Sequence, residues 1–352
     1  MLGDLKKVIW AGMPGGVCNL QCQYCYTGAR KGKQGQCLYS VEHMLKCFHQ
    51  ARFGGPIFFG GASGGETLFW NGIVDFTRGM LAQGHIVSYT TNMTMSKVIR
   101  SFCEFDPELR QRLQLDASLH YLELKREKLL PVFFENLRRI GQAGISYAIF
   151  ICISDAYIPY LEEIHNVCKK ETGILPVAGM VREYSYDGVH RTMTYSSDID
   201  DLVHRTCDAR QWDLQKRVYG QHRAEKCYAG ALSFNLDLES GTYTKCWGKS
   251  KTIGVGERFL NHCPSLLQRA GAKLKLTISH HKGNIFDDPS TPIIFEPMGD
   301  CPFPDCVCAS YLCWGLVPGF DVPTHSRVFF HRSAVSQTIW TQMDKKLMID
   351  ES

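Results

Sequence analysis

Residues 7–25 read KVIWAGMPGGVCNLQCQYC, and this stretch decides how the rest of the chain is interpreted. An apolar run at 7–13 is followed by two glycines and then by three cysteines spaced C-x3-C-x2-C. The apolar run predicts a short buried strand, and the cysteines stand on the loop that follows it. Because α/β proteins bind ligands at the carboxyl edge of a parallel sheet, we expect a ligand site on this loop.

Outward from this stretch, the chain alternates between strand-like and helix-like patterns. Six strands in a row, with a helical segment between each strand and the next, predict a parallel sheet, because parallel neighbours need crossover connections. Six strands are fewer than the eight of a closed barrel, so an open partial barrel and a doubly wound sheet are both compatible with the pattern. The strands are expected at 7–13, 56–61, 85–92, 113–120, 146–153 and 175–182, and the helices at 40–48, 69–82, 96–102, 130–143 and 158–169.

The composition excludes several classes of protein. The chain has 352 residues, of which 44% are hydrophobic and 21% charged, as in globular proteins. A net charge of +4 does not favour binding to nucleic acid or to an anionic membrane. The first 16 residues lack the pattern of a signal peptide, and no apolar run reaches the roughly 18 residues of a membrane span. We therefore expect the reducing cytoplasm, where clustered cysteines more often bind metal than form disulfides.

Cys18, Cys22 and Cys25 are candidate metal ligands. Three thiolates can hold three irons of a [4Fe-4S] cluster and leave the fourth iron open to another ligand. The alternatives are a structural zinc site or three incidental thiols. Zinc usually takes four ligands, and no fourth cysteine or histidine lies nearby at the usual spacing.

With Tyr24 before its last cysteine, the loop closely resembles that of the radical S-adenosylmethionine (radical SAM) superfamily. Residues 62–67, ASGGET, strengthen this resemblance, since Gly64, Gly65 and Glu66 look like the family's GGE motif, which holds the amino group of the methionine moiety. Thr67 departs from the family's usual Pro. The resemblance implies that residues 1–200 form a partial (β/α)6 TIM-like barrel.

The same resemblance implies the chemistry. A [4Fe-4S] cluster on the three cysteines would bind S-adenosylmethionine and cleave it to a 5′-deoxyadenosyl radical, which takes a hydrogen atom from the substrate. Such an enzyme also needs an electron donor such as flavodoxin or ferredoxin.

Polar residues on the third and fourth predicted strands indicate a ligand-filled lumen, because parallel strands are normally near-continuous hydrophobic runs. Side chains alternate along a strand, so each polar set should share one face. The sets are Ser88, Thr90 and Asn92 on the third strand, and Asp116, Ser118 and His120 on the fourth. By resemblance, Asn92 and Ser118 contact the methionine carboxylate and the ribose of S-adenosylmethionine.

Three further residues follow later strands or end them. Ser154 is a similar candidate for cofactor binding after the fifth strand. His120 and Arg182 are candidate catalytic residues, His120 by facing the substrate and Arg182 by pairing with a carboxylate. The alternatives are a hydrogen-bonded histidine at a strand end and a surface ion pair.

A second cysteine group begins near an alternating segment, 233–244, which predicts an antiparallel hairpin. Its spacing, C-x13-G-x4-C, and the Gly-Asn-Ile triplet at 283–285 resemble the SPASM/twitch extension of radical SAM enzymes. The later cysteines depart from that extension, with C-x4-C-x-C-x4-C in place of C-x2-C-x5-C-x3-C. The candidate ligands are Cys227, Cys246, Cys301, Cys306, Cys308 and Cys313.

This second resemblance implies a small Cys-rich domain at 201–352, including a C-terminal tail, with at least one auxiliary [4Fe-4S] cluster. Cys207 or Cys263 would complete a second cluster. A zinc domain with the same thiols is the alternative.

Three functions are compatible with these patterns. The first is a radical enzyme that modifies a peptide, and the second is one that oxidises or otherwise modifies a sugar-like small molecule. The third is a non-catalytic metal-binding or regulatory protein. Only 17 residues precede Cys18, so we expect no fused peptide-recognition domain.

Overall fold

The computed structural model describes residues 7–25, 35–62, 64–184, 190–192, 195–218, 229–231, 233–244, 281–293 and 295. Its first six strands pair in parallel and in chain order, which confirms the predicted parallel sheet. They are β1 (Lys7–Gly12), β2 (Ile57–Ala62), β3 (Ile86–Thr91), β4 (Leu113–Ser118), β5 (Ser146–Ile153) and β6 (Val177–Met180).

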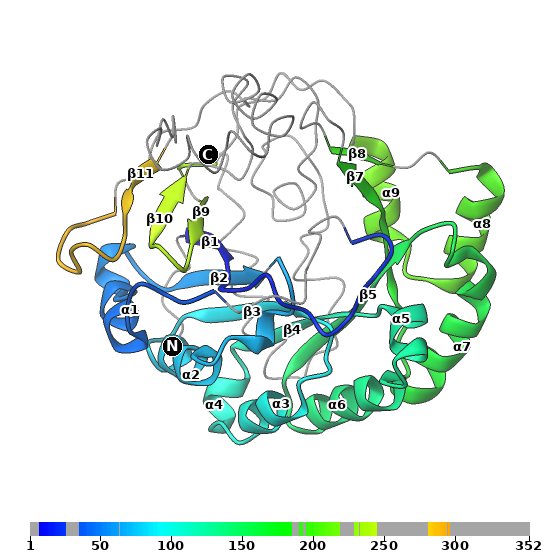
Figure 1. Cartoon of the computed structure of the whole chain (residues 1–352), viewed down its shortest axis with the longest axis horizontal. Helices are drawn as coiled ribbons and strands as arrows, with labels where there is room; N and C mark the ends of the chain where they lie inside the picture. The colour runs from blue at the N-terminus through cyan, green and yellow to red at the C-terminus, as the bar shows by residue number, and fades with distance from the viewer. Residues whose placement is uncertain are drawn as a thin grey trace, which may run out of the picture.

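The helices that connect these strands lie on the outer, convex side of the curved sheet (Figure 1). A doubly wound sheet reverses its strand order and carries helices on both faces, so the consecutive order found here indicates the open partial barrel. The helices are α1 (Val41–Cys47), α2 (Ile73–Ala82), α3 (Ser96–Cys103), α4 (Pro107–Arg110), α5 (Tyr121–Arg126), α6 (Leu130–Gln142) and α7 (Leu161–Thr172). Short 3-10 helices occur at η1 (Gln50–Arg52), η2 (Thr67–Phe69) and η3 (Ile158–Tyr160).

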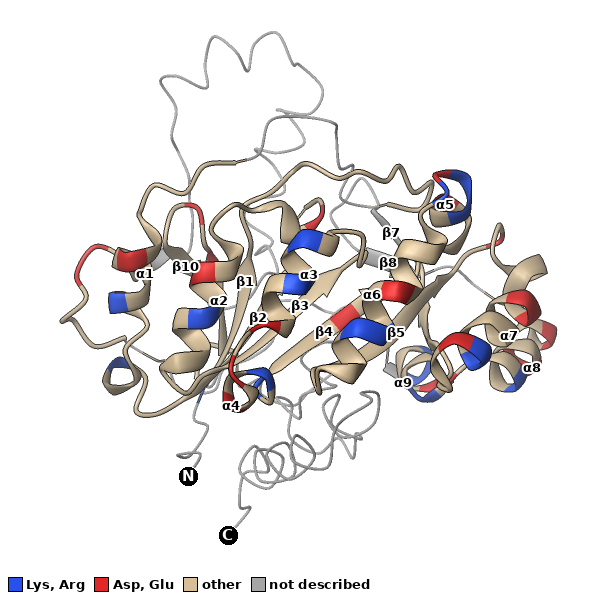
Figure 2. Cartoon of the chain, turned by 90° about the horizontal axis from the view of Figure 1, so that it is seen from below, with Lys and Arg blue, Asp and Glu red and all other residues tan. Residues whose placement is uncertain are grey.

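The helices form where the sequence supplies caps and an apolar face. Ser40 caps α1 as predicted, because its hydroxyl accepts from the N–H of His43 (3.2 Å). In α6, Phe133, Leu137 and Ile140 are fully buried at helical spacing and pack against the sheet. Figure 2 shows acidic and basic residues interspersed on the helices that cover the barrel.

The predicted hairpin is confirmed by β9 (Ser233–Asp237) and β10 (Thr242–Thr244), which pair antiparallel. β9 also pairs in parallel with β1, so the hairpin extends the barrel sheet beyond its first strand. A further strand, β11 (His281–Asn284), pairs with β10. The side-chain amide of Asn284, in the Gly-Asn-Ile triplet, donates to the carbonyl of Ser240 (2.8 Å) and so stabilises the hairpin turn.

Beyond the sixth strand the structure departs from prediction. The strand expected at 175–182 ends at Met180, and Arg182 begins β7 (Arg182–Tyr184), which pairs with β8 (His190–Thr192) in a separate two-stranded sheet. Two unpredicted helices follow, α8 (Ser197–Thr206) and α9 (Arg210–Val218). The domain boundary near residue 200 falls within α8 and stays a prediction.

The open edge of the sheet at β6 is covered by α9. The side-chain oxygen of Gln215 accepts from the N–H of Met180 (2.7 Å), which satisfies a backbone donor on this edge. Within the described residues, no helix is long and apolar enough to cross a membrane.

Candidate active site

The three N-terminal cysteines lie on the loop that leaves the carboxyl end of β1. Cys18 and Cys22 are half-buried, and Cys25 is exposed. The N–H of Cys25 donates to the carbonyl of Cys22 (3.1 Å), so the chain turns between the second and third thiols. Gly16 precedes them with φ = 106°, a backbone conformation that favours glycine.

The loop after β2 lies directly against the cysteine loop. The N–H of Glu66 donates to the carbonyl of Val17 (2.8 Å). A Cβ on Gly65 would lie 2.1 Å from that same Val17 oxygen, so only glycine fits there. A Cβ on Gly64 would meet no atom within 4 Å among the described residues, so this glycine borders open space.

The Glu66 carboxylate ties this loop to the carboxyl end of β3. Its Oε1 accepts from the Thr91 hydroxyl (2.5 Å) and from the Leu68 N–H (3.0 Å), and its Oε2 accepts from the Asn92 N–H (2.7 Å). Glu66 is only 2% exposed. Burial raises the pKa of the carboxyl group, and the three hydrogen bonds oppose that shift.

Asn92 connects the end of β3 to the first cysteine. Its side-chain amide donates to Oδ1 of Asn19 (2.9 Å) and to the sulfur of Cys18 (3.8 Å). Its own Oδ1 accepts from the hydroxyl of Thr94 (2.6 Å), which in turn accepts from the Asn19 amide (2.9 Å). This closed set of hydrogen bonds fixes Asn92 beside the cysteine loop rather than leaving it directed into the lumen.

Tyr24 links the cysteine loop to the other side of the barrel. Its hydroxyl lies 2.6 Å from Nδ1 of His120 and 3.4 Å from the hydroxyl of Tyr157. The rings of Tyr24 and Tyr157 meet edge to face with centroids 5.4 Å apart. His120 therefore contacts the cysteine loop through Tyr24.

The thiols of Cys18 and Cys22 share an electrostatic environment. Burial raises the pKa of both thiols, and Cys25 adds to each shift because a nearby thiolate is a like charge. Iron would offset this penalty by supplying positive charge, so the donor set fits three cluster thiolates. In the described part of the chain, no three His, Cys, Asp or Glu side chains already converge in ligand geometry.

The remaining predicted site residues lie at later strand ends. Ser118 ends β4 and is half-buried. Ser154 follows β5, is 8% exposed, and its hydroxyl has no hydrogen-bond partner among the described residues, so it has capacity for a ligand. Arg182 begins β7, and the direction of its side chain lies outside the described structure.

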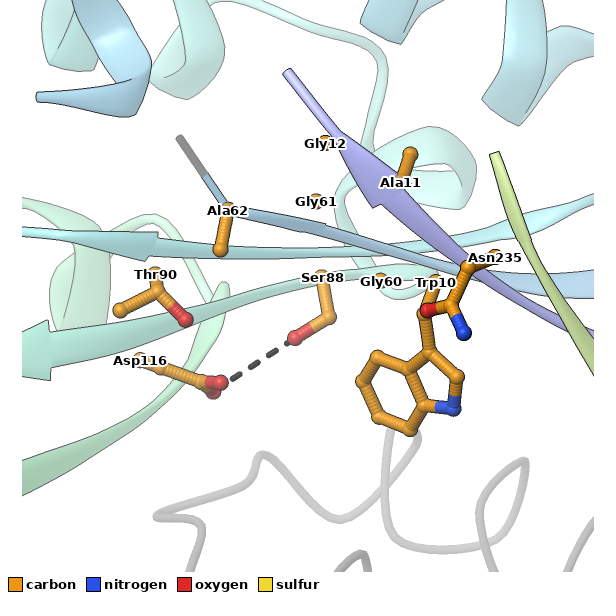
Figure 3. Close-up of a pocket in the computed structure, with 10 residues that line it drawn as sticks. All are labelled: Trp10, Ala11, Gly12, Gly60, Gly61, Ala62, Ser88, Thr90, Asp116 and Asn235. Atoms are coloured by element: carbon orange, nitrogen blue, oxygen red, sulfur yellow. Dashed lines mark hydrogen bonds between the residues drawn. The ribbon is translucent and has the colours of Figure 1, made fainter. Parts of the chain in front are cut away.

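The predicted polar lumen is present in part, through three of the six predicted residues. Ser88 and Thr90 of β3 and Asp116 of β4 line one pocket on the inner face of the sheet, as strand alternation predicts (Figure 3). Trp10 and Asn235 line the same pocket, and the sequence alone did not single them out. Strand alternation could have found Trp10, because it lies two residues before Gly12 on β1 and therefore on the same face of the strand as this other pocket residue.

The fold has counterparts among solved structures. SuiB of Streptococcus suis bound to the precursor peptide SuiA is similar with a TM-score of 0.51 at 12% identity, over 82% of this chain and 64% of SuiB. The chain has the radical SAM fold. AnSMEcpe with bound AdoMet aligns at 12% identity over 80% of this chain and 79% of its own, with a TM-score of 0.48.

The chain spans about three fifths of the length of SuiB in the alignments to that enzyme. No protein-family model matches the sequence, and no curated protein matches it either. The radical SAM fold is thus supported by three-dimensional similarity and by the motifs, at a sequence identity of only 12%.

The second cysteine group cannot be placed on this fold in the same way. Cys227, Cys246 and Cys263 lie outside the described residues, as do Cys301, Cys306, Cys308 and Cys313. Cys207 is described, and it lies in the hydrophobic core at 4% exposure, where burial raises the pKa of its thiol to about 11.

Proposed function

We propose that this chain is a radical SAM enzyme that holds a [4Fe-4S] cluster on Cys18, Cys22 and Cys25 and modifies a peptide. One connected set of contacts supports the proposal. Val17, next to Cys18, bonds the backbone of Glu66, and the Glu66 carboxylate bonds the backbone of Asn92. The Asn92 side-chain amide in turn donates to the sulfur of Cys18. The cysteine and glycine motifs therefore meet at the carboxyl edge of the barrel, although they lie on different strands.

Several residues are available to hold S-adenosylmethionine at this edge. Oε2 of Glu66 accepts one hydrogen bond and has capacity for a second, from the methionine ammonium group. The open space beside Gly64 admits the methionine backbone. Tyr24, Asn92, Ser118 and the hydroxyl of Ser154 complete the proposed cofactor contacts.

When bound, the cluster would supply one electron to cleave the sulfonium of S-adenosylmethionine, which yields methionine and a 5′-deoxyadenosyl radical able to oxidise or rearrange a substrate. The chain's own residues bind and orient these groups. Fixed strand ends restrict the positions of Cys18, Glu66 and Asn92, so the cofactor meets a preorganised site. Flavodoxin or ferredoxin would deliver the electron, in the cytoplasm.

A peptide is the proposed substrate because SuiB, which has the same fold, was solved with a precursor peptide. Arg182 remains a candidate for acting on that substrate, and His120 is a candidate for positioning Tyr24. At least one auxiliary cluster would bind to the second cysteine group, in the proposed domain at 201–352. The hairpin between Cys227 and Cys246 supports this, because it has the turn at Gly241 that the SPASM-like spacing requires.

The test is anaerobic reconstitution followed by iron, sulfide and zinc analysis, with 5′-deoxyadenosine measured after reduction in the presence of S-adenosylmethionine. The triple variant with Ala at Cys18, Cys22 and Cys25 should lose about four irons and all cleavage. Cys103→Ala is the matched control, since its thiol bonds the Arg139 carbonyl on the outer helices. Zinc in place of iron would support the non-catalytic alternative. Cleavage by the triple variant would show instead that Cys18, Cys22 and Cys25 do not hold the cluster that cleaves S-adenosylmethionine.

A further inference from the structure

A pocket of about 240 Å³ opens on the inner face of the barrel sheet. It is built by five strands, β1, β2, β3, β4 and β9, so the hairpin that follows residue 230 contributes to it. Its lining residues are Trp10, Ala11, Gly12, Gly60, Gly61, Ala62, Ser88, Thr90, Asp116 and Asn235 (Figure 3).

Glycine on β2 leaves space for the indole ring of Trp10, which forms one side of this pocket. A Cβ on Gly60 would lie 2.6 Å from the indole ring of Trp10, so the ring occupies the space that a larger residue would take. The ring of Trp10 also meets Phe58 edge to face, with centroids 5.8 Å apart. The indole is therefore held in place on the side of the sheet toward which Ser88 and Asp116 also point (Figure 3).

Hydrogen bonds orient the polar wall opposite the indole. The side-chain amide of Gln114 donates to the Ser88 hydroxyl (3.0 Å), and that hydroxyl donates to Oδ1 of Asp116 (3.5 Å). Because the Ser88 proton is directed at the carboxylate, the polar wall presents mainly acceptors to a ligand. Asp116 is half-buried and Thr90 is exposed, so solvent and ligands reach this wall.

The pocket reaches the carboxyl edge at Gly12 and Ala62, and its part between Trp10 and Asp116 lies deeper than the proposed cofactor site. Asp116 precedes Ser118 by two residues on β4, which places it about 6.6 Å further from the carboxyl edge of the sheet. Trp10 precedes Gly12 by the same interval on β1. A ligand between Trp10 and Asp116 would therefore lie deeper in the lumen than the residues proposed to hold S-adenosylmethionine.

We infer that this pocket binds a positively charged organic group of the substrate, an alkylammonium or a guanidinium, between the Asp116 carboxylate and the Trp10 ring. A carboxylate only accepts, and a cationic donor bonds it roughly twice as strongly as a neutral one. The face of an indole also attracts cations. The volume is below the roughly 300 Å³ at which pockets for whole ligands begin, so the pocket takes one substituent. This inference rests on the proposed function only in naming the occupant as substrate.

Binding can be measured without turnover. The reconstituted protein is labelled with 5-fluorotryptophan, and the Trp10 resonance among the six tryptophans is assigned with Trp10→Phe. Titration with n-butylammonium or n-butylguanidinium should shift that resonance saturably, and 1-butanol should not. Asp116→Asn should weaken the response about tenfold or more. Asp75→Asn, on the exposed face of α2, is the matched control and should change nothing.

The other five tryptophan resonances report whether each variant is folded. If Asp116→Asn does not fold, Ser88→Ala tests the same wall, because it removes the donor to the carboxylate and should change the affinity for the cation. Tighter binding of methyl glucoside than of either cation would overturn the inference in favour of a sugar. Absence of any cation response would overturn it as well. Cleavage of S-adenosylmethionine, assayed on the same preparation, tests the proposed function separately.

Discussion

The hydroxyl of Tyr24 lies 2.6 Å from Nδ1 of His120, a residue 96 positions further along the chain. The contact joins the cysteine loop to the start of α5, on the far side of the barrel. Burial lowers the pKa of His120 to about 4, so its ring is neutral at physiological pH and one ring nitrogen can accept. We interpret His120 as a positioning residue for Tyr24, in place of the catalytic role considered from sequence.

His120→Gln tests that interpretation. The variant should lose about 1–3 kcal/mol of unfolding free energy, because the buried hydroxyl of Tyr24 loses a partner. Cleavage of S-adenosylmethionine should persist, with weaker cofactor binding. Tyr160→Phe, which alters an exposed tyrosine, is the control. Urea unfolding and 5′-deoxyadenosine formation are the measurements, and a thousandfold fall in cleavage at unchanged stability and affinity would restore the catalytic role.

The two glycines of the GGE motif should respond differently to the same change. Gly65→Ala would place a Cβ 2.1 Å from the Val17 oxygen, so we expect a distorted cysteine loop and reduced iron loading. Gly64→Ala meets no described atom within 4 Å, so iron loading and stability should stay normal. If S-adenosylmethionine occupies that space, Gly64→Ala should weaken its binding about tenfold or more. Equilibrium binding and iron counts measure both, and normal cofactor affinity in Gly64→Ala would place the cofactor elsewhere.

Glu66→Gln addresses the carboxylate between the motif loops. Glutamine would direct an amide N–H₂ at the backbone N–H of Asn92 or at the donors on Oε1, so one buried donor loses its acceptor. We expect a loss of about 1–3 kcal/mol in unfolding free energy and weaker binding of S-adenosylmethionine, with the cluster retained. Thr91→Val is the comparison, because it removes one donor and leaves the charge. Loss of the cluster with unchanged cofactor affinity would contradict this role for Glu66.

The sheet was predictable because most of its strands are short apolar runs between turn residues, and β5 has the predicted bounds. α4 and α5 were missed because four and six residues contain less than two helical turns, too few to show a period. The helix expected from residue 69 begins at Ile73, since Glu66 first caps the 3-10 turn at η2.

The site residues were predictable by motif, but their partners were not. Glu66 bonds Asn92 because parallel pairing of β2 and β3 brings the loops after both strands together, and that register depends on the whole sheet. Tyr24 meets His120 across a distance in sequence that no local pattern reports. Trp10 and Asn235 share a pocket only because β9 joins β1, which the hairpin pattern alone does not specify.

His85 should make stability depend on pH. Its ring is fully buried, accepts from the Ile57 N–H (3.2 Å) and lies 2.7 Å from the Phe48 carbonyl, and burial lowers its pKa to about 4. The unfolded histidine, with its ordinary pKa near 6.5, binds the proton more readily. The contribution of neutral His85 is therefore fully present above pH 6.5 and lost as pH falls toward 4, by about 3 kcal/mol.

Urea unfolding of wild type and His85→Gln at several pH values checks this expectation. The variant should be less stable at pH 7 but should lose less stability between pH 6.5 and 4. His204→Gln, at an exposed site on α8, is the comparison: the backbone of Asp200 and the carboxylate of Asp213 raise the pKa of His204, so its contribution is lost as pH rises above 6.5 instead of as pH falls. Parallel pH curves for wild type and His85→Gln would show that other groups dominate the acid response.

The last prediction concerns the hairpin and the second cysteine group. Cys227 and Cys246 flank β9 and β10 in sequence. Cys227→Ala and Cys246→Ala should each remove about four irons if the proposed auxiliary cluster binds there. Cleavage of S-adenosylmethionine should persist, because it needs only the cluster on Cys18, Cys22 and Cys25. The hairpin also contacts the N-terminal cysteine loop directly, because the Glu239 carboxylate of the hairpin turn accepts from the Gly15 N–H (3.3 Å). A change in the hairpin can therefore alter the cysteine loop without any loss of metal.

Glu239→Gln separates that connection from metal loss. It weakens the contact with the cysteine loop while leaving every cysteine in place, so iron content should stay normal. Any fall in cleavage then measures the effect of the Glu239–Gly15 contact alone. Loss of a ligand also removes metal-derived folding energy, and circular dichroism must show that the cysteine variants are folded. If folded Cys227→Ala keeps all of its iron, the hairpin holds no cluster, and the SPASM-like interpretation of residues 227–313 is wrong.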